Sequence, residues 1–297
     1  MGPGLIIGAA DDDPSGIATY SQAGAQFGYS MLWTVVFTLP LMAAIQTVSA
    51  RIGFVTGRGL AANVKERFPR WVLLSVVGLL LAANTLNIAA DIAAMAEALR
   101  LLVGGSAHVY AVSFGLLCLV LQVFLPYTTY VRWLKWLTLA LLAYVAVVFS
   151  LRIDWPHVLL AVVWPRLTIT HEALLTVVAV FGTTISPYLF FWQAAQEMED
   201  TSPQGASPRA AADVRRPLRR IKIDTIAGMT FSNLIAFFII LSTAATLHAA
   251  GVRDIQTSAQ AAEALRPLAG DFTCLLCSLG IIGTGLLAVP VLAGSAA

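Results

Sequence analysis

Three consecutive carboxylates, Asp11, Asp12 and Asp13, interrupt an otherwise apolar segment of the chain. Pro14 follows directly and removes the N–H that the carbonyl four residues earlier would accept in a helix, so a helix break is expected here. Backbone carbonyls without partners and carboxylates are the oxygen ligands that hard divalent cations prefer. The stretch therefore predicts a cation site with Asp13 as a ligand. For Asp11 and Asp12, a solvating or gating role in a water-filled vestibule is an equal alternative.

A second polar interruption, "GTTISPY" at residues 182–188, has the same character. Unwound backbone inside a membrane is tolerated where it lines a cavity or contacts a ligand. A carboxylate at that depth costs about 2.5–3.5 kcal/mol on the lenient insertion scale. One Pro-containing break is often only a kink, since Pro and Gly are frequent in membrane helices. Two breaks, one of them carrying three Asp residues, indicate a binding site.

The composition identifies the environment of these residues. Of the 297 residues, 58% are hydrophobic and 11% are charged, and the mean hydropathy is +0.80. A soluble globular domain carries about 25% charged residues. Runs such as Leu101–Val131 hold no charge and exceed the roughly 20 residues that cross a bilayer as a helix. The chain is predicted to be an all-α polytopic protein of a bacterial-type cytoplasmic (inner) membrane, with the lipid bilayer as partner and no nucleic acid.

About eight membrane-spanning helices are expected from the apolar runs. The first is broken into Gly4–Ala10 and Gly16–Phe27, and the sixth runs from Glu172 to Met198 around the break at 182–188. The others are expected at Met31–Val55, Trp71–Val103, His108–Leu125, Val131–Leu151, Ile223–Ala249 and Asp271–Ala293. An amphipathic segment, "SAQAAEALRPL", leads into the last one.

Basic residues indicate the orientation of the chain. Thirteen of the 18 Lys and Arg residues lie in three loops, at 51–70, 132–135 and 209–222. Even numbers of crossings separate these loops, so all three lie on one side of the membrane. Since cytoplasmic loops carry an excess of Lys and Arg, the N-terminus is predicted to be cytoplasmic. The loop at about 200–220, rich in Pro, Ser and Ala, is expected to be mobile.

The two broken helices indicate an internal symmetry. Five crossings separate them, so they should run in opposite directions, as in inverted repeats of five plus five helices with the substrate site where the broken helices meet. Residues 1–151 would form the first repeat, and residues 152–297 an incomplete second one with helices six to eight. The chain stops at "VLAGSAA", in or just after the eighth helix, and is expected to be a fragment.

These segments resemble a known family. "GPGLIIGAADDDPSGIATYSQAGAQFGY" is similar to the first helix of the NRAMP (natural resistance-associated macrophage protein) divalent-metal transporters, whose hallmark there is Asp-Pro-Gly-Asn. "GTTISPYLFFWQAAQE" is similar to their sixth helix, whose hallmark is Met-Pro-His. The likeness covers the whole chain, including "DIAAMAEAL" in the third helix and "SLGIIGTGLLAVPVLAGSAA" in the eighth. It implies a LeuT-type fold and import of a metal ion as transported substrate, with no enzymatic activity and no cofactor.

The departures from the family pattern bear on which ion is carried. Asp13 keeps the hallmark Asp, but Gly16 replaces the hallmark Asn. Ser186 replaces the Met, a soft thioether ligand, and Thr183 stands where the family has Ala. The resemblance therefore implies a metal site at Asp13, Gly16, Thr183 and Ser186 without a soft ligand. Oxygen ligands suit Mg²⁺ and Mn²⁺, and small residues leave room for the waters that Mg²⁺ retains. This is the character of the NRAMP-related magnesium transporters.

Two groups that would carry a coupled proton in the family are also replaced. Tyr188 stands for the hallmark His, and the Asp…Glu pair of the third helix is Asp91 and Ala94. The predicted function is therefore import of Mg²⁺ (and Mn²⁺) by uniport driven by the membrane potential. A proton-coupled Mn²⁺/Fe²⁺ transporter of conventional NRAMP type is one alternative, and a cation-coupled organic-solute carrier of LeuT fold is another.

Further polar residues fit an ion pathway or an outer layer around the site. These are Asp11, Asp12, Asn87, Asp91, Tyr188 and Gln193. Interhelical hydrogen bonds are an equal alternative for Asn87 and Asp91, which lie on one face of the third helix. An intramembrane aspartyl protease is excluded, because the Tyr-Asp and Gly-x-Gly-Asp motifs are absent. A channel or structural membrane subunit stays open, as does the oligomeric state.

Overall fold

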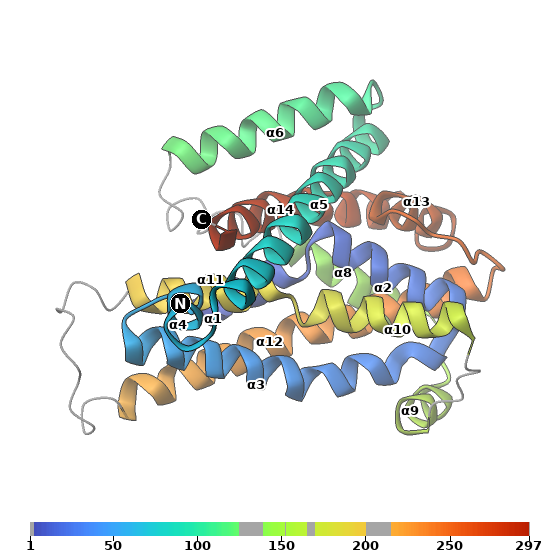
Figure 1. Ribbon diagram of the computed structural model, residues 1–297. Coiled ribbons are helices and arrows are strands. Elements are labelled where there is room, and N and C mark those ends of the chain that lie inside the picture. Colours follow the sequence, from blue (N-terminus) through green and yellow to red (C-terminus); the bar gives the residue numbers. More distant parts are fainter. Residues whose placement is uncertain (1–2, 125–138, 152, 165–169, 200–214, 297) are drawn as a thin grey trace.

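The computed structural model describes residues 3–124, 139–151, 153–164, 170–199 and 215–296 (Figure 1). Every regular element in these ranges is a helix. Six segments among them are long and apolar enough to cross a membrane: Pro14–Thr56, Arg70–Val103, Ala107–Phe124, His171–Glu199, Arg216–His248 and Phe272–Ser295. The first of these contains the second half of the expected first helix and the whole expected second helix. The start of the expected helix 131–151 lies outside the described residues. The predicted all-α polytopic fold is confirmed.

The first helix is broken where the carboxylates stand. α1 (Pro3–Asp11) ends before α2 (Pro14–Phe27) begins. Asp13 caps α2: its backbone is extended, with φ −67° and ψ 163°, and its side chain accepts a hydrogen bond from the N–H of Gly16. Asp is a preferred N-cap residue, and Pro is preferred at the first helical position. The Asp-Pro pair therefore starts α2 at a fixed residue.

The sixth helix is broken in the same way. α10 (His171–Thr184) and α11 (Pro187–Glu199) are joined through Ile185 and Ser186. Pro187 is the first residue of α11, as Pro14 is of α2. Thr170 caps α10 by accepting a hydrogen bond from the N–H of Ala173. Both predicted breaks are confirmed.

The remaining helices follow the predicted spans to within three residues where both can be compared, apart from α12. They are α3 (Leu32–Thr56), α5 (Arg70–Val103), α6 (Ala107–Phe124), η2 (Leu139–Leu141) with α8 (Leu142–Ser150), and α14 (Asp271–Ala296). A short 3-10 helix that was not predicted, η1 (Gly28–Met31), joins α2 to α3. Three short helices lie in the connections: α4 (Leu60–Arg67), α9 (Trp155–Val163) and α13 (Ser258–Ala269). Of these, only α13 coincides with a segment singled out in the sequence.

α12 (Arg215–Thr243) begins well before the predicted start at Ile223, and it continues into a π-helical turn, η4 (Ala244–His248). The predicted loop at about 200–220 is therefore wrong at its C-terminal end, because residues 215–220 are helical. Residues 200–214 lie outside the described residues. Arg and Leu are good helix formers, so the helix continues beyond the apolar segment on which the prediction was based.

Close contacts between small residues hold the broken helices to their neighbours. A Cβ on Gly4 of α1 would lie 2.6 Å from the backbone N of Thr225 on α12, and a Cβ on Gly8 would collide with the Gly228 carbonyl. Gly53 of α3 lies equally close to the Ala194 carbonyl of α11. Small residues at such interfaces let membrane helices approach each other closely. α1 is thus fixed to α12, and α11 to α3.

The two broken helices run antiparallel. α1 packs beside α11, and α2 packs beside α10. Figure 1 shows them in a middle layer, with α3 and α12 on one side and α5 and α14 on the other. The two breaks therefore lie at the same depth, in the centre of the molecule. The division into repeats at residues 151 and 152 stays a prediction.

The outermost helices present apolar side chains to the surroundings. Leu79 and Leu86 on α5 and Val123 on α6 are among the most exposed apolar side chains, as expected for a surface that faces lipid. On its inner side α5 is held to α14 by Asn84, which donates hydrogen bonds to the Leu292 carbonyl (2.8 Å) and the Ser295 hydroxyl (2.7 Å).

Candidate cation site at the two helix breaks

The Asp13 carboxylate joins the two breaks. Its Oδ1 accepts hydrogen bonds from the N–H of Gly16 (2.6 Å) and the hydroxyl of Ser15 (2.7 Å). Its Oδ2 accepts one from the hydroxyl of Tyr188 on α11 (3.0 Å). The carboxylate is 2% exposed. Because an ionised carboxylate has about four acceptor positions, these three bonds orient Asp13 and leave capacity for a cation.

The first break also frees two backbone carbonyls from helical bonding. The Ala10 carbonyl would pair with the N–H of residue 14, which proline lacks, and the Tyr188 hydroxyl lies 3.5 Å from it instead. The Asp11 carbonyl would pair with the N–H of Ser15, but that N–H donates to Oδ1 of Asp91 at 3.1 Å. A carbonyl oxygen therefore becomes available directly beside the carboxylates.

The second break supplies neutral oxygens. Pro187 deprives the Thr183 carbonyl of its helical donor, and the Ser186 hydroxyl donates to that carbonyl at 2.5 Å. The neighbouring Thr184 donates to the Val180 carbonyl (2.6 Å) and lies 3.0 Å from the hydroxyl of Tyr20 on α2. The second break thus offers hydroxyl and carbonyl groups, and its own residues, 182–188, include no charged side chain.

Gly16 lies where oxygens of three chemical kinds converge. A Cβ added to Gly16 would lie 3.1 Å from Oδ1 of Asp13, 3.2 Å from the hydroxyl of Thr183 and 3.6 Å from the Asp11 carbonyl. Carboxylate, hydroxyl and carbonyl oxygens are the ligands of hard cations. The structure thus brings the predicted residues Asp13, Gly16 and Thr183 together, while the hydroxyl of the predicted Ser186 points back to its own helix.

Asp91 reaches the same place from α5. It is fully buried; its Oδ1 accepts the hydrogen bond from Ser15, and its Oδ2 has no hydrogen-bond partner among the described residues. Ser15 bonds to Asp13 and to Asp91 at once, through its hydroxyl and its N–H. The predicted pathway residue therefore lies beside the predicted ligand.

Asp11 and Asp12 share one hydroxyl that the sequence analysis missed. Ser232 of α12 lies 2.5 Å from Oδ2 of Asp11 and 3.3 Å from Oδ1 of Asp12. The two side chains are only 1% and 2% exposed, and Oδ1 of Asp11 has no partner among the described residues. A serine far along the chain, in an apolar helix, carries no local signal that would pair it with these carboxylates.

The two remaining pathway candidates lie apart from these contacts. Asn87 is half-buried on α5, and its side chain makes no hydrogen bond to another described residue. Gln193 is buried on α11, where its amide donates to the Thr225 hydroxyl at 2.8 Å. The structure therefore gives Gln193 a contact between α11 and α12, and the described hydrogen bonds of the Asp13 carboxylate involve neither residue.

In the part of the chain that the structure describes, no basic side chain pairs with the four buried aspartates, Asp11, Asp12, Asp13 and Asp91. Arg58 pairs with Glu66 and Arg100 with Glu97, and both pairs lie away from these aspartates in the sequence. The same part of the chain holds no cluster of three or more His, Cys, Asp and Glu side chains that could enclose a metal. Buried carboxylates without counter-charges are costly in a membrane. The arrangement suits a cation held by Asp13 and neutral oxygens, with part of its water retained.

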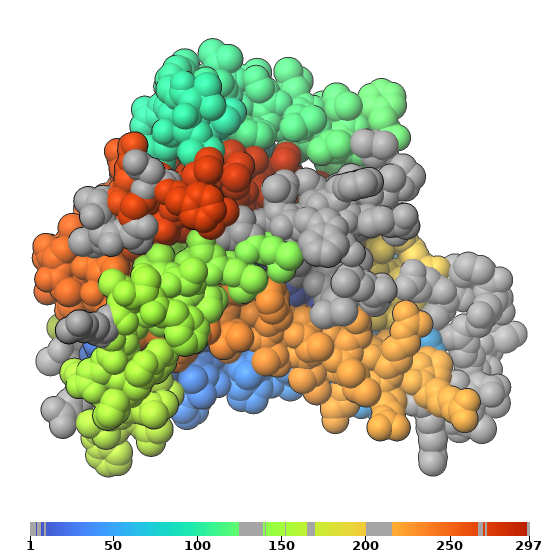
Figure 2. Space-filling model, turned by 180° about the vertical axis from the view of Figure 1, so that it is seen from behind, coloured from blue at the N-terminus to red at the C-terminus, as the bar shows by residue number. Residues whose placement is uncertain are grey.

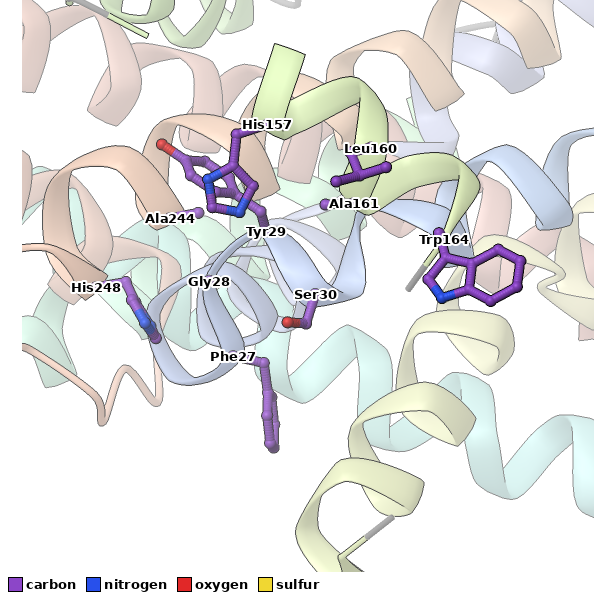
Figure 3. Close-up of a pocket in the computed structure, with 10 residues that line it drawn as sticks. All are labelled: Phe27, Gly28, Tyr29, Ser30, His157, Leu160, Ala161, Trp164, Ala244 and His248. Atoms are coloured by element: carbon purple, nitrogen blue, oxygen red, sulfur yellow. The ribbon is translucent and has the colours of Figure 1, made fainter. Parts of the chain in front are cut away.

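A separate cavity of about 360 Å³ lies between η1, α9 and η4 (Figure 3). The rings of Tyr29, His157, Trp164 and His248 line it, and the first two meet edge to face with their centroids 5.7 Å apart. No carboxylate is among the described residues that line it. It therefore lacks the charge that a divalent cation requires and is distinct from the site at the breaks.

Antiparallel broken helices that meet at a buried carboxylate, within a bundle of apolar helices, define an integral membrane protein of the LeuT-type fold. Among solved structures, the fold matches the Eremococcus coleocola manganese transporter in complex with an aromatic bis-isothiourea substituted compound, with a TM-score of 0.77 and 17% identity over 99% of this chain and 65% of that one. A mutant of that transporter gives a TM-score of 0.80 at the same identity and coverage.

The sequence comparisons identify the family. The model of the natural resistance-associated macrophage protein-like (Nramp) family matches residues 4–297, so the chain belongs to this family. It is 28% identical to the divalent metal cation transporter MntH of Aeromonas hydrophila, over 96% of this chain and 69% of that protein. It is 30% identical to MntH of Verminephrobacter eiseniae, over 96% and 64%. The chain thus spans about two thirds of the length of these relatives.

Proposed function

We propose that this protein carries a divalent metal cation across a bacterial cytoplasmic membrane. The observation that carries the proposal is the group of oxygens around Gly16, where the Asp13 carboxylate, the Thr183 hydroxyl and the Asp11 carbonyl surround the space of one methyl group. The names of the relatives, divalent metal cation transporter and manganese transporter, support this general activity.

The ligand types favour Mg²⁺ and Mn²⁺ as the transported ions. Neither break contains a sulfur or imidazole group, since Ser186 and Tyr188 occupy the positions where the family pattern has Met and His. Sites made of carboxylate, carbonyl and water suit Mg²⁺ and Mn²⁺, whereas softer ligands select other metals. Mg²⁺ is usually held by one or two carboxylates and keeps several waters. Asp13 would bind the ion directly, and Thr183 and the Asp11 carbonyl would bind it or its waters.

Uniport driven by the membrane potential is the proposed mode of transport. The bond from Tyr188 to Asp13 puts a phenol, which ordinarily keeps its proton up to about pH 10, beside the ligand. A negative interior potential drives a divalent cation inward, towards the side on which the distribution of Lys and Arg places the N-terminus.

A proton-coupled manganese transporter is the second candidate. Asp91 favours it: this carboxylate is buried next to the site, and its Oδ2 has no hydrogen-bond partner among the described residues. Buried intramembrane carboxylates form the proton relays of pumps and transporters. The manganese transporter among the structural relatives agrees with this choice of ion.

Proteoliposome uptake tests the proposal. Under an inside-negative potential we expect uptake of Mn²⁺ that Mg²⁺ inhibits, and loss of that uptake in Asp13→Ala. Unchanged uptake in Asp13→Ala would end the site assignment. With a pH-sensitive dye inside the vesicles, uniport predicts no acidification during metal entry. Acidification that disappears in Asp91→Asn would establish the proton-coupled alternative.

A further inference from the structure

The N-terminal turns of α12 form a basic groove away from the cation site. Arg216, Arg219 and Arg220, with Ile223, Asp224 and Ala227, line a concave surface of about 480 Å³. These positions recur every three or four residues, so they lie along one side of the helix. The three arginines are exposed to the surroundings. We call this surface the arginine groove. In Figure 2 this end of α12, coloured light orange, lies at the lower right.

The arginine groove keeps an excess of positive charge. None of its three arginines belongs to an ion pair among the described residues, whereas Arg58 pairs with Glu66 and Arg100 with Glu97. The one carboxylate of the groove, Asp224, accepts a hydrogen bond from the N–H of Gly4 at 2.8 Å. Three guanidinium groups thus face one carboxylate that already bonds to α1.

An apolar surface continues directly from the groove. Ile223 is 58% exposed and Ile226 is 39% exposed, and Leu234 further along α12 is 49% exposed. The membrane-spanning segment of this helix begins at Arg216. The helix therefore passes within two turns from exposed guanidinium groups to side chains that suit acyl chains. The opposite side of the same turns is packed, since Ile221 is buried against Ala50 and Phe54.

We propose that the arginine groove binds the phosphate of an anionic phospholipid, with an acyl chain lying along Ile223 and Ile226. The planar guanidinium group matches a phosphate with two parallel hydrogen bonds. A basic residue at the surface of an anionic membrane contributes about 1 kcal/mol, or about fivefold in affinity. A water-soluble acidic partner would match the arginines but would leave the adjoining isoleucines uncovered.

The bound lipid would lie beside the attachment of the first half-helix. Asp224 belongs to the groove and also holds Gly4 of α1, and the next turns of α12 contact Gly4 and Gly8 through backbone atoms. An anionic headgroup would compensate the arginines at this point. The inference does not depend on which ion the protein carries.

Retention of lipid by the purified chain in detergent, measured by native mass spectrometry, tests this site. We expect phosphatidylglycerol to be retained over phosphatidylcholine. In the triple variant Arg216→Gln, Arg219→Gln, Arg220→Gln, affinity for phosphatidylglycerol should fall about 100-fold, from about fivefold for each arginine. The control removes the same charge elsewhere, through Lys65→Gln, Arg67→Gln and Arg70→Gln, and should change affinity less than about fivefold, the contribution of one residue.

Other outcomes decide against the site. Equal loss in the control and in the triple variant would mean that only net charge matters. Competition by inorganic phosphate at the concentration of the lipid would assign the groove to free phosphate. Unchanged affinity for phosphatidylglycerol in Ile223→Asn would contradict the proposed contact between Ile223 and an acyl chain. If the triple variant is not monodisperse, the single variants Arg216→Gln, Arg219→Gln and Arg220→Gln replace it. Each should lower the affinity for phosphatidylglycerol about fivefold.

Discussion

The two helix breaks share one backbone design but differ in charge. Each half-helix after a break begins at a proline, Pro14 or Pro187, and in each case a hydroxyl lies at the carbonyl that the proline leaves without a donor. The first break adds Asp11, Asp12 and Asp13, whereas the second adds none. The two breaks thus have the same backbone geometry, but only the first break supplies negative charge for binding a cation.

This difference explains why the charged break needs more support. Its carboxylates receive donors from three other segments: Ser15 at the start of α2, Tyr188 of α11 and Ser232 of α12. The Ser186 hydroxyl of the second break bonds within its own turn. Buried charges require several polar partners, whereas neutral groups are satisfied by one hydrogen bond. We therefore expect substitutions in the first break to affect cation binding most.

The largest effect is expected for Asp13→Asn. Asn is also a good N-cap, so α2 should still begin at residue 14, but the charge for the cation is lost. Because even the outer partners of metal ligands cost 10- to 100-fold in affinity, we expect a loss of about 100-fold or more. Isothermal calorimetry with Mn²⁺ and Mg²⁺ measures it. Thr183→Ala, which removes a neutral oxygen from the second break, should lose less than tenfold. If both variants lost the same amount of cation affinity, the first break would not be the one that supplies the charge.

A smaller effect is expected for Gly16→Ala. The added methyl group would lie 3.1 Å from Oδ1 of Asp13 and 3.2 Å from the Thr183 hydroxyl, so it would occupy the space between the ligands. We expect affinity for Mn²⁺ to fall about tenfold or more, as for other disturbed ligand shells.

Gly182→Ala is the matched control for that substitution. Gly182 precedes the second break, and a Cβ there would meet nothing within 4 Å. Since Gly in a helix is less favourable than Ala by about 1 kcal/mol, this variant should bind Mn²⁺ normally and melt slightly higher. A loss of binding in Gly182→Ala as large as in Gly16→Ala would show that the helix backbone, not the ligand space, determines affinity.

The breaks and most helix limits could be predicted from the sequence because their signals are local. Asp13-Pro14 and Ser186-Pro187 mark the breaks through missing N–H groups, and long apolar runs mark the spans. The short helix α9 also had a local signal, since Asp154 caps it by accepting from the N–H of His157. The start of α12 was misjudged because a run of arginines was interpreted as a loop.

Contacts between distant segments were predictable only through the resemblance to a family. The family pattern drew attention to Tyr188, which does bond to Asp13. Nothing in the pattern pointed to Ser232, because a lone hydroxyl in an apolar helix is normally bonded within its own helix. The bond between Asp91 and the N–H of Ser15 was also unforeseen, because it requires the first break to release that N–H.

Ser186→Met tests what the neutral side of the site selects. A thioether is a soft ligand, and soft ligands favour metals such as Cd²⁺ over Mg²⁺. Affinity for Cd²⁺ relative to Mg²⁺ should therefore rise about tenfold, because the second break then contributes a soft donor. Competition calorimetry with the two ions gives this ratio. The Ser186 hydroxyl is turned to the Thr183 carbonyl, so the longer Met side chain must reach past it; an unchanged ratio would mean that a thioether at position 186 does not reach the ion.

The smallest effect is expected for Tyr188→Phe, which removes the bond between the two breaks. Oδ2 of Asp13 loses its donor at 3.0 Å, but Oδ1 keeps the N–H of Gly16 and the hydroxyl of Ser15. Hydrogen bonds between membrane helices average about 0.6 kcal/mol, so affinity for Mn²⁺ should change about threefold.

Tyr20→Phe separates that effect from a general loosening of the two broken helices. The Tyr20 hydroxyl joins α2 to Thr184 of α10 at 3.0 Å, and it is not among the described hydrogen-bond donors to Asp13. Both variants lose one bond between the broken helices, so both should lower the melting temperature by a similar small amount. Only Tyr188→Phe should change affinity for Mn²⁺. If Tyr20→Phe changes the affinity for Mn²⁺ equally, the contact between the two broken helices matters more than the orientation of the Asp13 carboxylate. Cation binding at the charged break would then depend on how it packs against the neutral break.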